Sequence, residues 1–146
     1  YVALQVFIPL RQHIYPHDAG WSEEGHNYSW RMKTRTKRGA VSYTVVDLDS
    51  GYTWKVNPAK ELTETQTKDL GGNPEFILQY AHHLRDTYRK KGMEVSVYAH
   101  ARASLNGYPW QTLIDPSRDL AREESGVHHY KWIRDWGQES SLANFR

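Results

Sequence analysis

The stretch that decides the fold runs from Asn73 to Ser104 and reads NPEFILQYAHHLRDTYRKKGMEVSVYAHARAS. Its first half predicts one long helix over residues 74–91, because Asn73 is a good N-cap and Pro74 suits the first helical position. Apolar side chains recur there at the spacing of a buried helix face; they are Ile77, Tyr80, Ala81, Leu84 and Tyr88. Three cations in the last turn and then Gly92 mark its end.

The second half of the stretch switches to the two-residue period of a strand. Over residues 95–104, small apolar side chains alternate with polar ones, so the predicted strand has one apolar face and one polar face. Asn106–Gly107 follows, and this dipeptide is typical of a tight hairpin turn. We therefore expect residues 109–114 to return as the next strand.

Upstream of the helix, residues 28–56 show the same two-residue period in three runs. The runs are separated by Lys37–Gly39 and Asp49–Gly51, which have the composition of turns, and Asn57–Pro58 ends the last of them. This segment predicts a three-stranded antiparallel meander.

A short polar helix is predicted around Glu61–Leu70, ended by Gly71–Gly72. Residues 116–146 have a weaker period and predict a short helix with an irregular tail. The whole pattern predicts an α+β fold. We expect an antiparallel sheet of about five strands, a β-meander plus a β-hairpin, with one long helix and a short helix packed on it.

Composition excludes several classes of function. The chain has 146 residues, of which 38% are hydrophobic and 25% charged, as in an ordinary globular domain. It contains no cysteine, which removes disulfides, thiolate metal sites and cysteine nucleophiles. Its 19 basic and 17 acidic residues give a net charge of +2, so we expect no nucleic-acid partner, and any electrostatic function must come from local clusters.

The most apolar stretch is Tyr1–Leu10, YVALQVFIPL, about half the ~20 residues that span a bilayer. It lacks the basic region and cleavage site of a signal peptide. We expect a short helix within residues 1–15 that Pro9 ends or kinks. The chain also begins without Met, which suggests an excised piece whose first residues continued something apolar. Such a segment should be poorly packed in water.

The most unusual local feature is the cationic run WRMKTRTKR at residues 30–38. In a strand, Arg31, Lys33, Arg35 and Lys37 would point to one face. Like charges along one face repel each other unless an anion lies near them. The functional interpretation of the run is a binding site for carboxylates, phosphates or lipid headgroups. The alternative is a solvated edge strand whose cations oppose aggregation.

Two histidine pairs, His82–His83 and His128–His129, invite a metal interpretation. Adjacent histidines on a helix point about 100° apart, so one pair cannot hold one ion from one face. No HExxH motif accompanies them. The sequence therefore predicts no metal site.

Two other groups are candidates for chemistry. His100 and Arg102 share the polar strand face with Tyr98 and could serve as acid, anion clamp and orienting group. Trp21–His26 places two carboxylates and a histidine in a loop, where binding residues often lie; the alternative is a solvated acidic loop. Neither group has the nucleophile and partners of a complete catalytic set, so the residues by themselves predict no catalytic residue.

Several short stretches of the sequence, taken together and in their order along the chain, indicate a protein family. They are PLRQHIYP at 9–16, WSEEGHNYSWRM at 21–32, the hairpin exit with Asp49, Gly51, Asn57 and Pro58, ILQYAHHL at 77–84, SLNG at 104–107 and LIDPSRDLA at 113–121. In this order and spacing they resemble the vitamin K-dependent γ-glutamyl carboxylase family, over roughly residues 8–121. The chain looks like a bacterial-type member, within the broader horizontally transferred transmembrane family.

In that family these stretches follow the last membrane helix of an integral membrane protein. The resemblance implies that residues 1–14 are a membrane-exit segment and that residues 15–146 form a single extramembrane domain on the periplasmic or lumenal side. The catalytic lysine base and the vitamin K site belong to the transmembrane half, so the isolated domain would not be catalytic. The parent enzyme would oxidise vitamin K hydroquinone with O₂ and add CO₂ to a substrate glutamate.

The resemblance also implies partners and binding residues. The partners are the protein's own transmembrane domain, a glutamate-containing peptide or protein substrate, and the membrane surface. The family's glutamate-binding region matches the stretch around Ser29, where a hydroxyl and an aromatic wall can position a carboxylate. Arg31 and Arg35 stand where the animal enzyme has Asp and His. The substrate-binding candidates are His26, Tyr28, Ser29, Trp30, Arg31 and Arg35.

Two other hypotheses stay open beside this one. The chain could be a non-catalytic binding module for an acidic peptide or an anionic membrane surface. It could also be a free-standing small enzyme that uses His100, Arg102 and the Glu23–Glu24 loop.

Overall fold

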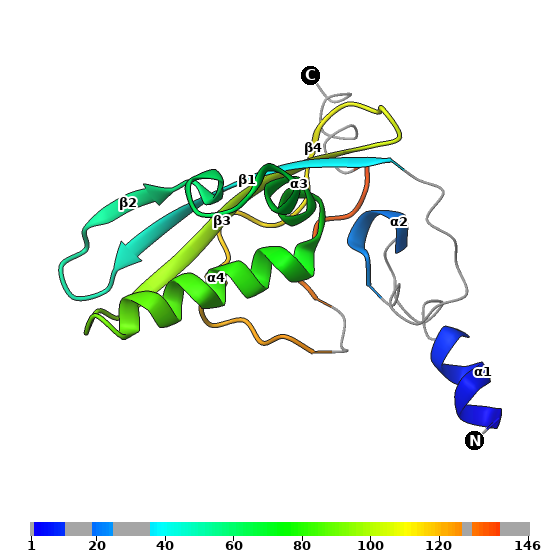
Figure 1. Cartoon of the computed structure of the whole chain (residues 1–146), viewed down its shortest axis with the longest axis horizontal. Coiled ribbons are helices and arrows are strands. Elements are labelled where there is room, and N and C mark those ends of the chain that lie inside the picture. Colours follow the sequence, from blue (N-terminus) through cyan, green and yellow to red (C-terminus); the bar gives the residue numbers. More distant parts are fainter. Residues whose placement is uncertain (1, 11–18, 25–35, 127–129, 138–146) are drawn as a thin grey trace.

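The computed structural model describes residues 2–10, 19–24, 36–126 and 130–137, and confirms the α+β class (Figure 1). Its centre is an antiparallel sheet of four strands in the order β2-β1-β3-β4. The strands are Lys37–Asp47 (β1), Thr53–Val56 (β2), Val95–Leu105 (β3) and Gln111–Thr112 (β4). The first strand of the predicted meander, in residues 28–35, lies outside the described residues.

The sheet is built around its two long strands, β1 and β3, which have 11 residues each and pair along their full length. The pairing runs from Lys37 opposite Leu105 to Asp47 opposite Val95. β2 and β4 are shorter and lie at the two edges. The predicted hairpins from β1 to β2 and from β3 to β4 are both present.

Two helices, α3 (Glu64–Gly72) and α4 (Pro74–Arg89), lie against one face of the sheet (Figure 1). Small side chains on β3 at Ala99, Ala101 and Ala103 are buried on this face, which lets the helices approach closely. Ile77 and Leu78 of α4 are fully buried in the same core. Burying a side chain of this size stabilises the fold by about 1.5–3 kcal/mol.

The ends of α4 follow the prediction. The Asn73 side chain accepts a hydrogen bond from the Glu75 amide at 2.9 Å, and Pro74 occupies the first helical turn. The helix ends at Arg89, and Gly92 adopts a φ of +79°. A residue without a Cβ adopts this conformation at little cost, so the chain can turn back into β3 there.

One turn prediction is wrong, and one contact explains it. Lys37–Gly39 belongs to β1, whereas α3 ends at Gly72, so the predicted glycine pair forms the end of that helix. Gly39 and Gly71 meet backbone to backbone, because a Cβ built on Gly39 would lie 2.0 Å from the Gly71 carbonyl carbon. Both glycines therefore serve close packing of helix on strand, and neither makes a turn.

The predicted N-terminal helix is present as α1 (Val2–Leu10), with Pro9 inside it. Val2 and Phe7 are each 71% exposed, as expected for an apolar segment without a packing partner. Among the described residues, no helix is long and apolar enough to cross a membrane.

The Trp21 region and the C-terminal region are packed together. Trp21, on the short helix α2 (Ala19–Ser22), is fully buried, and its indole donates to the Arg134 carbonyl at 2.6 Å. The described parts of 116–137 form turns, and Ile133 makes an isolated bridge with Ile114. The sequence analysis missed this long-range packing, because these segments lack a regular period.

Candidate functional site

A pocket of about 420 Å³ opens at the end of the sheet where β1 begins and β3 turns into β4. We call it the hairpin-end pocket. It is lined by Thr36, Arg38, Ser104, Gly107, Tyr108, Pro109 and Trp110. The described lining contains one cation, two aromatic side chains and the aliphatic hydroxyls of Thr36 and Ser104. None of these lining residues carries a carboxylate. This composition suits an anionic group.

The shape of the pocket depends on the tight turn after β3. Asn106 and Gly107 have φ values of +51° and +81°, and the Tyr108 amide donates to the Leu105 carbonyl at 3.0 Å. Positive φ at both central positions is the requirement of the hairpin turn that Asn-Gly favours. The Ser104 hydroxyl then donates to the Tyr108 carbonyl at 2.6 Å. These bonds hold the pocket wall rigid.

Thr36 is joined to the turn by a reciprocal pair of hydrogen bonds. The Thr36 amide donates to Asn106 Oδ1 at 3.0 Å, and the Asn106 amide donates to the Thr36 carbonyl at 2.7 Å. The two residues are 70 positions apart in the chain. The chain therefore enters β1 at the edge of the pocket.

Arg38 is the cation of the pocket. It lies opposite Ser104 on the sheet face away from α3 and α4, and its side chain is exposed. Within the described residues, its guanidinium has no hydrogen-bond or ion-pair partner. An exposed guanidinium whose donors are available can bind a carboxylate or phosphate through two parallel hydrogen bonds.

Lys37 has a different environment from the one predicted. The sequence analysis placed it on a cationic face with Arg31 and Arg35. Its ammonium group donates to the Trp21 carbonyl and lies 5.4 Å from the centre of the Trp21 ring. Lys37 therefore ties α2 to the sheet, whereas Arg38, the next residue, faces the pocket.

The substrate-binding candidates from the sequence lie outside the described residues, and the structure does not place them. They are His26, Tyr28, Ser29, Trp30, Arg31 and Arg35. Arg35 directly precedes Thr36, whose position beside the hairpin is given above. The structure therefore places Thr36, the residue that follows the candidate stretch, in the lining of the pocket.

His100 and Arg102 lie exposed on the open face of β3. Arg102 Nη2 donates to the Trp110 carbonyl at 2.8 Å, so this side chain helps to hold the hairpin.

The interpretation of Glu23–Glu24 as a solvated acidic loop is wrong for Glu24. Glu24 is 6% exposed, and its Oε1 accepts a hydrogen bond from the Tyr130 amide at 2.7 Å. A buried carboxylate needs such donors, and this one joins two distant loops.

The histidines of α4 are separated as the helix geometry predicts. His82 Nε2 lies 2.8 Å from the Glu123 carbonyl, whereas His83 lies beside the Tyr80 ring. Among the described residues, no group of three His, Asp or Glu side chains could hold a metal ion. His128–His129 lies outside those residues.

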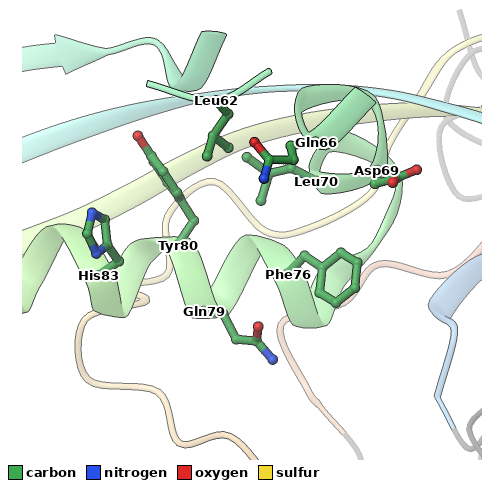
Figure 2. A pocket seen from close by; sticks show the side chains of 8 residues that line it. All are labelled: Leu62, Gln66, Asp69, Leu70, Phe76, Gln79, Tyr80 and His83. Carbon is green, nitrogen blue, oxygen red and sulfur yellow. The ribbon is translucent and has the colours of Figure 1, made fainter. Parts of the chain in front are cut away.

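A second cavity, of about 340 Å³, lies between α3 and α4 (Figure 2). Its lining is amphipathic and comprises Leu62, Gln66, Asp69, Leu70, Phe76, Gln79, Tyr80 and His83. The Tyr80 hydroxyl donates to Glu61 Oε2 at 2.9 Å, and burial together with this carboxylate raises the pKa of Tyr80. Tyr80 is therefore a neutral hydrogen-bond donor, and the described lining contains no serine, threonine, cysteine or lysine that could act as a nucleophile.

The sequence analysis missed Arg38, Tyr108 and Trp110 as pocket residues. The Asn106–Gly107 signal located the turn correctly. The register of β1 against β3, which brings Arg38 next to that turn, has no local signal in the sequence.

Comparison with known proteins agrees with the resemblance found in the sequence. The family model described as vitamin K-dependent gamma-carboxylase, lumenal domain, matches residues 1–139. No curated protein and no solved structure matches the chain. Because the family match covers nearly the whole chain, the chain belongs to the family of the vitamin K-dependent gamma-carboxylase lumenal domain.

Proposed function

We propose that this domain binds a glutamate-containing substrate and positions it over the membrane-embedded active site of a carboxylase-like enzyme. In this proposal the domain lies on the lumenal or periplasmic side and contacts its own transmembrane domain. The parent enzyme couples oxidation of vitamin K hydroquinone by O₂ to addition of CO₂ to the substrate glutamate. Vitamin K, when bound in the transmembrane half, supplies the strong base, and no residue of this chain is assigned to that step.

The observation that carries the proposal is the pair of hydrogen bonds between Thr36 and Asn106. This pair holds Thr36, the residue that follows the candidate stretch, at a pocket lined by Arg38, whose guanidinium has no partner among the described residues. The residues proposed for substrate binding are His26, Tyr28, Ser29, Trp30, Arg31 and Arg35, together with Arg38.

The chemistry of the pocket suits a carboxylate that must be held without reacting. Arg38 can donate two parallel hydrogen bonds to the carboxylate oxygens, and Trp110 can cover the aliphatic part of the side chain. A charge-assisted hydrogen bond of this kind contributes about 1.5–3 kcal/mol. The group that holds the substrate is then separate from the group that removes its proton, which fits a domain without a catalytic set.

Calorimetric titration of the chain with a short glutamyl peptide tests this proposal. Arg38→Ala should weaken binding by about 1.5–3 kcal/mol, and Arg38→Lys should recover only part of it because an ammonium cannot form the two-bond fork. Lys55→Ala is the matched control, since Lys55 is an exposed cation at the other end of the same sheet. The matching glutaminyl peptide should bind weakly to every variant.

Equal binding of the glutamyl peptide by the Arg38→Ala and Lys55→Ala variants would remove the pocket from the proposal. The free energy of unfolding of both variants, from thermal unfolding, should stay within about 0.5 kcal/mol of that of the unchanged chain, as for most exposed positions.

A further inference from the structure

The hairpin that closes the pocket exposes aromatic side chains to solvent. Residues 106–110 are five consecutive exposed residues. Tyr108 is 62% and Trp110 43% exposed, and Pro109 lies between them. We call Tyr108, Pro109, Trp110 and the guanidinium of Arg102 the hairpin tip. Exposed aromatic rings on a tight turn cost solvation free energy unless they contact a partner.

The polar atoms of the hairpin tip are available for a partner. Among the described residues, neither the Tyr108 hydroxyl nor the Trp110 indole N–H has a hydrogen-bond partner. Tyr and Trp rings with a free polar end are enriched where a bilayer meets water, because one end of the ring is apolar and the other hydrated.

The charge of the hairpin tip is positive. Arg102 is exposed and bonds the Trp110 carbonyl through one guanidinium nitrogen, while its other donors have no partner among the described residues; Arg38 lies in the adjoining pocket. The turn at the opposite end of the sheet differs in charge but also has an exposed aromatic ring. There Tyr52 is 69% exposed and the same turn contains Asp47 and Asp49.

We propose that the hairpin tip docks on an anionic lipid surface, with Tyr108 and Trp110 in the interfacial region and Arg102 on lipid phosphates. Charge complementarity favours this partner, and the family match is to a lumenal domain, which in the function proposed above lies against a membrane-embedded half. The proposal goes beyond substrate binding, because it assigns a lipid contact to Tyr108 and Trp110, which the sequence analysis did not select.

Docking in this way would set the orientation of the hairpin-end pocket. The hairpin tip forms one wall of the pocket, so its insertion would place the pocket mouth at the level of the lipid headgroups. A rigid turn suits this role, because the bonds within the hairpin hold the rings before contact and little ordering entropy is lost on binding.

A site-specific fluorescent probe tests the docking surface. The chain contains no cysteine, so Tyr108→Cys and Tyr52→Cys each create a single labelling position for a polarity-sensitive dye. Vesicles of phosphatidylcholine with an equal part of phosphatidylglycerol should shift the emission of the dye at residue 108 to the blue. The dye at residue 52 should not respond, and salt should reverse the shift because it screens the phosphates.

The helix α1 exposes Val2 and Phe7 and can contact vesicles by itself. Total binding is therefore not the readout, and both labelled variants should also be measured with Phe7→Ser. The blue shift at residue 108 should survive that change.

A second arm measures the charge contribution. Arg102→Ala should lower partitioning onto the anionic vesicles about fivefold, the effect of one cation near such a surface. Arg102→Lys should retain most of the partitioning, and Lys55→Ala should not change it.

Three results would overturn the proposal. One is an equal response of the dyes at residues 108 and 52, and another is a response to pure phosphatidylcholine that equals the response to the anionic vesicles. The third is a shift at residue 108 with glutamyl peptide alone but not with vesicles, which would assign the hairpin tip to the substrate. Because peptide binding is measured without lipid, failure of this proposal leaves the substrate proposal separately testable.

Discussion

The contact between Gly39 and Gly71 makes a sharp prediction about stability. A Cβ on Gly71 would lie 2.5 Å from the Gly39 carbonyl carbon and oxygen, and both of these are backbone atoms that cannot rotate away. Ordinary carbon contacts lie at about 3.5–4.0 Å. Gly71→Ala must therefore move α3 away from β1 by ~1 Å.

The expected cost follows from two opposing effects. Overpacking of this kind costs about 1–3 kcal/mol, and displacing a helix that covers the core places Gly71→Ala at the upper end. Replacing a helical glycine by alanine recovers about 0.5–1 kcal/mol. The net destabilisation should be about 2–2.5 kcal/mol, or ~6–8 °C in the melting temperature of a chain of this length.

The neighbouring residue offers a matched control. At Gly72, a Cβ would meet only the Lys37 side chain at 3.9 Å, which is ordinary contact. Gly72→Ala in the same helix should therefore be neutral or should stabilise the chain by up to ~1 kcal/mol. Urea unfolding followed by far-UV circular dichroism gives both free energies. Equal stability of the two variants would refute the packing argument.

Three further predictions concern a helix cap, the hairpin and a buried tyrosine. Asn73→Ala should lower the free energy of unfolding by about 1 kcal/mol, because the Glu75 amide loses its acceptor, and Asn73→Asp should not; chemical denaturation distinguishes the two. Asn106→Gly keeps the positive φ but removes the acceptor for the Thr36 amide, so glutamyl peptide should bind more weakly in calorimetry while the melting temperature falls by only a few degrees; unchanged binding would contradict the role given to that bond. Burial raises the pKa of Tyr43 well above its usual value, with the nearby Tyr80 adding to the effect. The folded state therefore disfavours the Tyr43 anion, so the stability from Tyr43 is complete below about pH 10 and is lost as pH rises above that value. Tyr43→Phe should flatten this alkaline decline, at a cost of about 1 kcal/mol near pH 7 for the lost bond to the Ile77 carbonyl; urea unfolding across the alkaline range measures both effects.

Much of the fold could be predicted from local signals. The helix α4, the strand β3 and the turn between β3 and β4 each have their own period or cap, and each was found close to its observed bounds. The errors fall where a residue type has two uses. Gly39 was predicted to lie in a turn, but the structure uses it for close approach to Gly71, and only tertiary packing separates these uses of glycine.

The candidate site was harder to predict from the sequence than the fold. Its parts come from the start of β1 and from the hairpin after β3, and no short-range pattern specifies that Arg38 lies opposite Ser104. Glu24 is similar: a carboxylate in a polar loop predicts solvent exposure, whereas its burial depends on the distant Tyr130 amide. The resemblance to the carboxylase family, which the family match over residues 1–139 confirms, came from the order of several stretches and not from local periodicity.

The bond pair between Thr36 and Asn106 also has a consequence for the order of folding. In the β1–β3 ladder, Asp47 and Val95 are the partners closest along the chain, and every later pair closes a longer loop. Loop closure costs entropy that increases with length, so we expect this ladder to zip from Asp47 towards Lys37. The Thr36–Asn106 pair lies beyond its last rung. The hairpin-end pocket should therefore be among the last parts to form, and under the substrate-binding proposal a newly made chain would become competent to bind only when its sheet is complete.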